Sequence, residues 1–262
     1  MAKFFPMFSG SEGNSTYIGS AAGGILVDAG VSYKKIKEAL LCADIPLTHI
    51  KAVLITHHHN DHIKGLKVFL KNNRVPVVAS RDTVYNLEFQ GIIDSDYPRI
   101  YINEVESAAF EELSVSAVPT SHDAKGSCCF VIQLAGQKVA VCTDLGIMTE
   151  EIVTALTGSS LVMLESNHDP VMLRLGPYPA ELKLRIASDV GHLPNAVCAE
   201  TLGKLYVSGT NRFVLAHLSR QNNTPEKAAS AARAALMDKG AVENEDYILY
   251  IAKPEGNKVI SI

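Results

Sequence analysis

The sequence predicts an α/β fold in which sheets are covered by helices. Short β-branched runs alternate with amphipathic helical patterns, and this alternation occurs in two successive halves of the chain. Of the 262 residues, 47% are hydrophobic and 20% are charged, a profile typical of a folded protein with a substantial core. No linker or low-complexity stretch interrupts the pattern, so we expect a single domain over residues 1–262.

The expected elements follow from the period of the apolar residues and from their turn and cap residues. Strands are predicted over residues 24–28, 51–56, 75–80, 127–134, 138–143, 161–165, 213–217 and 247–252. Helices are predicted over residues 32–43, 63–71, 81–90, 149–156, 180–188, 195–205 and 224–239. The last helix opens with Thr-Pro-Glu, a common helix start, and is rich in alanine.

Composition excludes several classes of protein. No apolar run approaches the roughly 20 residues that span a bilayer, and the N-terminal segment is too short and too broken for a signal peptide, so we expect a cytoplasmic protein without a membrane partner. The five cysteines form no CxxC pair and are predicted to be buried free thiols. The net charge is −4, so any nucleic-acid binding must depend on a local basic patch. The oligomeric state is not indicated.

The segment Thr56–Gly65, THHHNDHIKG, is the most informative stretch. It follows an apolar strand and precedes an amphipathic helix, which predicts that His57, His59, Asp61 and His62 lie on the connecting loop. Imidazole and carboxylate groups are ligands that suit zinc, manganese or iron. A histidine-rich surface loop is the alternative, and the HxHxDH spacing after a strand disfavours it.

This motif resembles the metal-binding motif of the metallo-β-lactamase superfamily. The resemblance implies an αββα sandwich of two mixed sheets flanked by helices, with a further His, an Asp and a last His at strand ends. The chain supplies His122, Asp144 and His217 in that order and context. A lone strand-end histidine is ordinarily a surface or core residue, and the shared order raises these positions above that expectation. Asp28, in LVDAG, matches the superfamily's structural aspartate.

The resemblance also implies a division of labour among the ligands. His57, His59 and His122 would hold one metal ion, and Asp61, His62 and His217 a second. Asp144 would bridge both, and a hydroxide between the metals is the expected nucleophile, oriented by Asp61. The two ions would be zinc or manganese, between which the sequence does not discriminate.

The branch of the superfamily is narrowed by individual residues. Asp144 stands where zinc β-lactamases have a cysteine, and His59 is retained where flavo-diiron oxidoreductases have a glutamate. The segments SGSEGNS, ESNHD, GHLPN and HLSRQNN resemble the YycJ (WalJ) group of bacterial proteins, which implies 5′→3′ exonuclease activity on DNA. Pro194 departs from that group, where serine is more usual. A thioesterase or small-molecule hydrolase of the glyoxalase kind is the alternative enzyme, and a metal-stabilised binding protein is the non-catalytic one.

Several residues are candidate substrate contacts. By the resemblance, His192 would face the scissile phosphate, where it could stabilise charge or protonate the leaving oxygen. A packing or capping role is the alternative. His168 is a weaker candidate. Ser219 and Asn223 could bind phosphate or fix the helix that starts near Thr224. Asn14 could present its amide to substrate, or its glycine-rich segment could be only a turn between two strands.

A possible nucleic-acid surface begins just after the motif. Lys64, Lys67, Lys71 and Arg74 recur at steps of three and four, while Leu66, Phe69 and Leu70 supply the opposite, buried face. The basic stripe could follow a phosphate backbone, or it could be an ordinary solvated face. The stretch between Asp144 and His217 is too short for the inserted domain of β-CASP nucleases. This favours cleavage at the ends of nucleic-acid strands over endonucleolytic cleavage.

Overall fold

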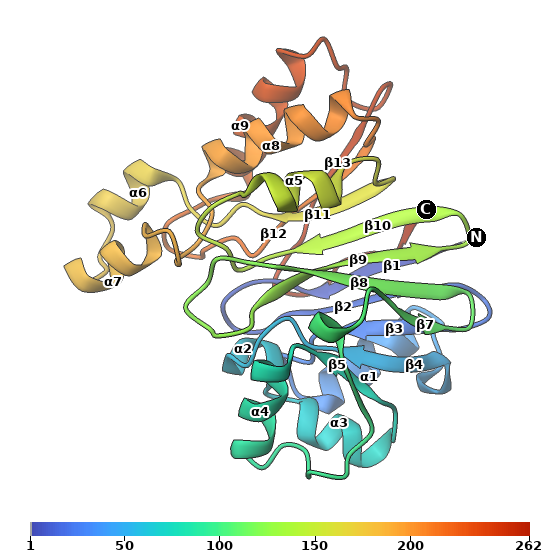
Figure 1. Ribbon diagram of the computed structural model, residues 1–262. Coiled ribbons are helices and arrows are strands. Elements are labelled where there is room, and N and C mark those ends of the chain that lie inside the picture. Colours follow the sequence, from blue (N-terminus) through green and yellow to red (C-terminus); the bar gives the residue numbers. More distant parts are fainter. Residues whose placement is uncertain (1) are drawn as a thin grey trace. The chain divides into compact units, whose positions relative to one another are not determined.

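The computed structural model describes residues 2–262 (Figure 1). Its strands form two seven-stranded sheets, each containing parallel and antiparallel pairs and each accompanied by helices. The first sheet has the strand order β14-β1-β2-β3-β4-β5-β6 and the second has the order β13-β12-β11-β10-β9-β8-β7. This arrangement confirms the α/β class and the two mixed sheets flanked by helices that the resemblance implies.

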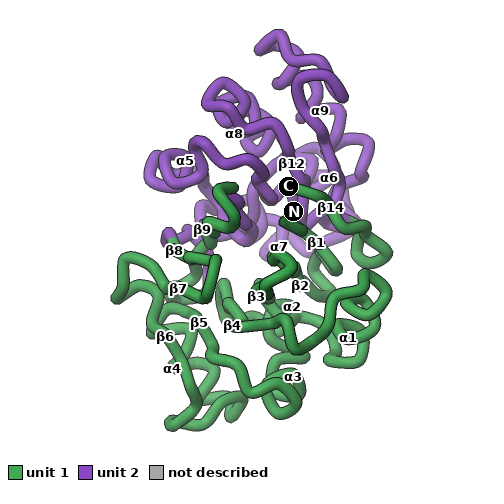
Figure 2. The backbone as a smooth tube through the Cα atoms, turned by 90° about the vertical axis from the view of Figure 1, so that its right-hand side faces the viewer, with its two compact units in different colours: residues 1–117, 124–137, 253–262 green, residues 118–123, 138–252 purple. Residues whose placement is uncertain are grey.

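The chain divides into two compact units, which Figure 2 shows in two colours. Unit 1 comprises residues 1–117, 124–137 and 253–262, and unit 2 comprises residues 118–123 and 138–252. The single domain over residues 1–262 stays a prediction. Among residues 2–262, no helix is both long enough and apolar enough to span a membrane.

Unit 1 is built on the first sheet. Its strands are β1 (Lys3–Phe8), β2 (Ser15–Gly19), β3 (Gly24–Val27), β4 (Ile50–Leu54), β5 (Val77–Ala79), β6 (Arg99–Tyr101) and β14 (Ile260–Ser261), with β7 (Ala108–Phe110), β8 (Leu113–Pro119) and β9 (Cys128–Leu134) in the second sheet. Its helices are α1 (Tyr33–Cys42), α2 (Asn60–Ile63), α3 (Leu66–Asn72) and α4 (Arg81–Phe89). Strands β3 to β6 are parallel. Burial on both faces explains the apolar runs of β3, β4 and β5.

Helices α1, α3 and α4 cover one face of this sheet (Figure 1). Ile36 of α1, Phe69 of α3 and Leu87 of α4 are fully buried against strand residues such as Val53. Ser32 caps α1, and Ser80 caps α4 in the same way, by accepting a backbone hydrogen bond. The expected helix over residues 63–71 is instead two helices, α2 and α3, with the break at Lys64–Gly65.

Unit 2 is a parallel α/β unit. Its strands are β10 (Gln137–Cys142), β11 (Leu161–Glu165), β12 (Arg212–Ala216) and β13 (Ile248–Ile251), each parallel to the next in this order. Its helices are α5 (Glu150–Leu156), α6 (Pro170–Leu175), α7 (Ala180–Ile186), α8 (Asn195–Val207) and α9 (Pro225–Met237). Thr224 caps α9, and Pro225 occupies its first turn, as the Thr-Pro-Glu pattern predicts.

The sequence did not reveal every element. Strand β1, KFFPMF, contains Pro6, which argues against a strand, and its pairing with β2 shifts register between Phe5 and Phe8. Short helix α6 was also missed. Four of the five cysteines are buried as predicted, but the prediction is wrong for Cys42, which is exposed at the end of α1.

Candidate metal centre

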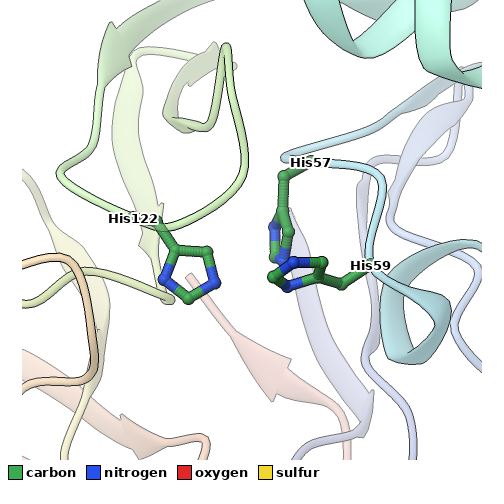
Figure 3. Close-up of side chains that lie close together, drawn as sticks. All are labelled: His57, His59 and His122. Atoms are coloured by element: carbon green, nitrogen blue, oxygen red, sulfur yellow. The ribbon is translucent and has the colours of Figure 1, made fainter. Parts of the chain in front are cut away.

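The first group of predicted ligands lies at the carboxyl end of strand β4, in unit 1. His57 and His59 are on the loop after the strand, and Figure 3 shows both side chains. Their rings lie edge to face with centroids 4.7 Å apart. Asp61 and His62 were expected on the same loop, but they lie within the short helix α2. The ring centroid of His62 lies 4.1 Å from that of His57, so the imidazoles of the motif lie side by side.

A buried carboxylate, Asp28, fixes this group. It accepts hydrogen bonds from the backbone N–H and the hydroxyl of Thr56, both at 2.9 Å, and its Oδ2 lies 2.7 Å from Nδ1 of His62. Burial raises the pKa of Asp28, although the charge and hydrogen bond of His62 act in the opposite direction. Because His62 faces Asp28 with Nδ1, its Nε2 is the nitrogen left to coordinate a metal.

The backbone beside Asp28 approaches α2 very closely. The N–H of Ala29 donates to the carbonyl of His62, and the N–H of Asn14 donates to the carbonyl of Asp61, each at 2.8 Å. A Cβ atom at Gly30 would lie 1.7 Å from the carbonyl oxygen of Asp61. Glycine is therefore required at position 30 for α2 to reach its place.

Asn14 joins the glycine-rich N-terminal turn to the motif. Its Nδ2 lies 3.3 Å from Oδ2 of Asp61 and 3.1 Å from Nε2 of His62, while its Oδ1 accepts from the N–H of Gly10. The turn lies between β1 and β2, as the alternative interpretation of this segment expects. Asn14 is thus beside two predicted ligands.

The second group lies at the carboxyl ends of parallel strands in unit 2. Possible ligand atoms of Asp144, Glu165, His192 and His217 all lie within 4.8 Å of one another. Asp144 follows β10, Glu165 ends β11 and His217 follows β12. Since these strands are adjacent and parallel, residues distant in sequence meet at one edge of the sheet.

Glu165 organises this second group, and the sequence analysis did not identify it as a site residue. Its Oε1 lies 2.9 Å from Nδ1 of His192 and 2.8 Å from Nδ1 of His217. Its Oε2 accepts backbone N–H groups of Leu145 and Leu193, both at 3.1 Å. A charged residue at the end of the buried strand LVMLE was the available signal, since such a carboxylate needs partners.

The electrostatics of Glu165 fix the orientation of both imidazoles. Burial acts to raise the pKa of Glu165, but the charge and hydrogen bonds of His192 and the hydrogen bond of His217 lower it to about 2. An ionised carboxylate only accepts hydrogen bonds, so each histidine must donate from Nδ1. Each Nε2 is then available to a metal ion or a substrate.

Asp144 and His122 complete the group in unit 2. The Oδ1 atom of Asp144 lies 3.4 Å from Nδ1 of His217, 3.7 Å from Nδ1 of His192 and 4.0 Å from Nε2 of His122. The Nδ1 atom of His122 lies 3.1 Å from the carbonyl oxygen of Gly191 and can only donate to it. His122, labelled in Figure 3, therefore also presents Nε2 for coordination.

His192 differs from its neighbours in exposure. Its side chain is 19% exposed, whereas that of His217 is 2% exposed. Burial acts to lower the pKa of His192, but the charge and hydrogen bond of Glu165, with Asp144 adding to them, raise it above its usual value. His192 is consequently an oriented imidazole that a molecule from solution can reach.

Three strand-end residues share an unusual backbone conformation. The φ angles are +60° for Asp28, +61° for Asp144 and +53° for His217. Few non-glycine residues adopt positive φ, and it costs about 1–3 kcal/mol where it occurs. Hydrogen bonds accompany this conformation at Asp28 and His217, and in all three residues it turns the chain at the end of the strand.

The remaining substrate-contact candidates have structural partners. The amide of Asn223 bonds Asn195 and the carbonyl oxygens of Ser166 and Asn167, and the hydroxyl of Ser219 accepts from the N–H of Asn222. These bonds favour loop fixation over phosphate binding. His168 is 3% exposed and lines a cavity of about 400 Å³; burial, the dominant effect, lowers its pKa to about 4.

Comparisons with known proteins agree with this geometry. The family model described as "Beta-lactamase superfamily domain" matches residues 24–218. The chain belongs to the metallo-β-lactamase superfamily. It is 34% identical to exodeoxyribonuclease YycJ of Bacillus anthracis over 96% of both chains. It is 30% identical to exodeoxyribonuclease WalJ of Streptococcus pneumoniae D39, covering 97% of this chain and 95% of that protein.

Solved structures share the fold at lower sequence identity. The metallo-β-lactamase fold protein YhfI of Bacillus subtilis has a TM-score of 0.73 at 14% identity and covers 98% of both chains. Zinc-bound PqqB of Methylobacterium extorquens has a TM-score of 0.69 at 17% identity and covers 100% of both chains. Together with the clusters of histidines and carboxylates, the family makes this chain a metal-dependent hydrolase.

Proposed function

We propose that the protein is a metal-dependent DNA exonuclease that digests strands in the 5′→3′ direction. The observation that carries the proposal is the placement of His192, which is oriented by Glu165, lies beside Asp144 and is open to solvent. An imidazole in that position suits a reaction at a phosphodiester, where charge develops and an alkoxide leaves. The names of the two relatives, both exodeoxyribonucleases, support the choice of substrate.

The proposal assigns the ligands of two divalent cations. His57, His59 and His122 would hold the first ion, Asp61, His62 and His217 would hold the second, and Asp144 would contribute to both. The donor set fits, because His62 and His122 keep Nδ1 on a carboxylate or carbonyl oxygen and offer Nε2. Zinc or manganese ions bound there would lower the pKa of a water molecule and stabilise negative charge on phosphoryl oxygens.

The chain's own residues then have separate tasks. Asp61 orients the attacking water. The amide of Asn14 donates a hydrogen bond to Oδ2 of Asp61 and so fixes its carboxylate. His192 donates a proton from Nε2 to the leaving oxygen, since its Nδ1 is engaged by Glu165. Glu165 stays ionised and keeps that proton on the correct nitrogen after each turnover.

Labelled linear DNA tests the proposal. The protein is loaded with zinc or manganese, its metal content is measured by mass spectrometry, and it is incubated with duplexes labelled at the 5′ or the 3′ end. Digestion from the 5′ end releases a 5′ label at once as a mononucleotide, whereas a 3′ label appears in progressively shorter fragments. Relaxed circular plasmid, which has no end, should stay intact.

Histidine variants supply the control. His59→Ala removes a proposed ligand and should lower the rate at least about a hundredfold, because the ligands support several kcal/mol of transition-state stabilisation. His49→Ala, in the short 3-10 helix Leu47–His49, changes a histidine outside the motif and should leave the rate unaltered. If metal-loaded protein released no nucleotide but hydrolysed S-acylglutathione, the exonuclease proposal would be wrong.

The cellular setting is part of the proposal. A cytoplasmic location, which we also propose, agrees with a DNA substrate. Substrate contacts at His168, Ser219 and Asn223 stay predictions, and the buried partners of Asn223 make it the weakest of the three.

A further inference from the structure

The basic stripe that begins after α2 and continues along α3 is a charged feature that the proposed chemistry does not use. Lys64, Lys67 and Lys71 are exposed, and Arg74 follows at the end of α3. Residues 32–74 contain eight Lys and Arg against three Asp and Glu, a net charge of +5 in a chain whose total is −4. Positive charge is therefore concentrated around the ligand motif.

The stripe is held in place by its opposite face. Ile63, Leu66 and Phe69 are at most 4% exposed and belong to the core of unit 1. The break between the helices is equally fixed, because the N–H of Gly65 donates to the carbonyl of Ala29 at 2.8 Å. Because that face is buried, the lysines at the intervening positions face solvent.

These three lysines also lack the ion pairs that several other basic side chains of the molecule form. Over residues 2–262, many exposed cations form ion pairs, such as Lys35 with Glu255 and Lys204 with Glu200. Lys64, Lys67 and Lys71 form none within the described chain. An unpaired row of cations repels itself and is stabilised when an extended polyanion neutralises it.

We infer that this stripe is the DNA-backbone track of the enzyme, and the inference rests on the proposed function. Lys64 lies two residues after His62, so the track begins at a proposed metal ligand and leads away from it along α3. Seven residues of helix span roughly 10 Å, and one strand of a duplex presents a phosphate about every 3.4 Å along the axis. Three lysines thus match about three consecutive phosphates adjoining the cleaved end.

The test uses two triple variants of the full-length protein that change the net charge equally. K64Q/K67Q/K71Q removes the track, and K239Q/K253Q/K258Q removes three exposed lysines elsewhere. DNA binding is measured by fluorescence anisotropy of a labelled oligonucleotide over a range of salt concentrations. Turnover is measured with the same DNA and with bis-p-nitrophenyl phosphate, which is too small to reach the stripe.

The track variant should bind DNA about tenfold or more weakly at low salt, and the slope of log affinity against log salt should fall by about 2 to 3. Its turnover of the small phosphodiester should equal that of the wild type, and the control variant should match the wild type throughout. Equal DNA affinity of both variants would overturn the inference while leaving the proposed function intact. Preferential retention of RNA by the stripe would overturn its assignment to DNA.

The two proposals fail in different ways. If wild-type protein bound DNA through the lysines but released no nucleotide with metal present, the exonuclease proposal would fall and the binding surface would stand. If wild-type protein digested DNA and the track variant digested it equally well at every salt concentration, only the track would fall.

Discussion

The two groups of predicted ligands are built in different ways around the same kind of support. In unit 1 the ligands are neighbours in sequence, and Asp28 holds one imidazole, His62, together with Thr56. In unit 2 the ligands come from separate strands, and Glu165 holds two imidazoles, His192 and His217. In both, a buried carboxylate that is not a proposed ligand binds Nδ1 of a histidine and so turns Nε2 away from itself. The two groups therefore share a buried carboxylate that orients histidines, although their predicted ligands are arranged differently along the chain.

The pKa shifts of the two carboxylates differ in direction. Burial dominates at Asp28 and raises its pKa, whereas the two histidines of Glu165 outweigh burial and lower its pKa to about 2. The backbone N–H of Thr56 donates to Asp28, and those of Leu145 and Leu193 donate to Glu165. Glu165 is thus the more strongly held anion, and more of its site depends on it.

The largest expected effect comes from neutralising these carboxylates one at a time. Glu165→Gln should lower kcat with DNA about a hundredfold, because two imidazoles lose their anionic acceptor. Asp28→Asn should lower it about tenfold, because only one does. The rates are measured together with metal content, which separates loss of ions from misorientation of His192.

Isosteric changes at exposed positions are the matched controls. Glu200→Gln, on α8, and Asp44→Asn, after α1, remove the same charges far from any proposed ligand and should leave kcat unchanged. Equal losses in Glu165→Gln and Asp28→Asn would break the comparison, since the number of imidazoles held would then not matter.

The sequence predicted the first group better than the second, for a physical reason. Thr56–Gly65 is a local motif, so its residue types and spacing could be interpreted without knowing the fold. His122, Asp144 and His217 were found through the family resemblance and through their positions at strand ends. Glu165 was missed because its role depends on two histidines, 27 and 52 residues away, that only the parallel strands bring to it.

The sequence also failed to predict local features that depend on backbone geometry. Asp61 and His62 were expected on a loop and lie in α2, because α2 and α3 are separated at Gly65, which the backbone of Ala29 approaches. The positive φ of Asp28, Asp144 and His217 has no sequence signal, since Asp and His adopt it only where hydrogen bonds compensate. Most helices and the strands β3 to β5 and β9 to β13, in contrast, were predicted from hydrophobic periodicity. The strands β1, β2, β6, β7, β8 and β14 were not, and the two-sheet arrangement came from the family resemblance.

A second prediction concerns the close backbone approach at Gly30, beside Asp61 in unit 1. Gly30→Ala would place a Cβ atom 1.7 Å from the carbonyl oxygen of Asp61, so α2 or the residue-30 turn must move. We expect a destabilisation of about 2–4 kcal/mol in urea unfolding, together with loss of metal. Gly203→Ala, within α8 and in ordinary contact only, should be neutral or slightly stabilising. A metal-replete Gly30→Ala protein of normal stability would contradict the assigned geometry.

The smallest expected effect concerns pH and the segment that follows Glu165. Asp169 caps α6 by accepting from the N–H of Met172 at 2.8 Å, and this bond, with Lys227 assisting, lowers the pKa of Asp169. A carboxyl whose pKa is lower in the folded state stabilises the fold above its unfolded pKa, and that stabilisation is lost as the pH falls through the folded value. His59, the corresponding cap residue of α2, makes no side-chain cap bond, so this pH dependence is specific to unit 2.

Asp169→Asn keeps a good cap and removes the charge, which isolates this contribution. The ion pair with Lys227 is partly exposed, so the wild type should be more stable than the variant by only about 0.5 kcal/mol at pH 6. The difference should shrink below about pH 4 and vanish near pH 2, as urea unfolding of metal-free protein at each pH would measure. A difference that grew towards low pH would mean that Asp169 is protonated more easily in the folded chain, which its two hydrogen bonds contradict.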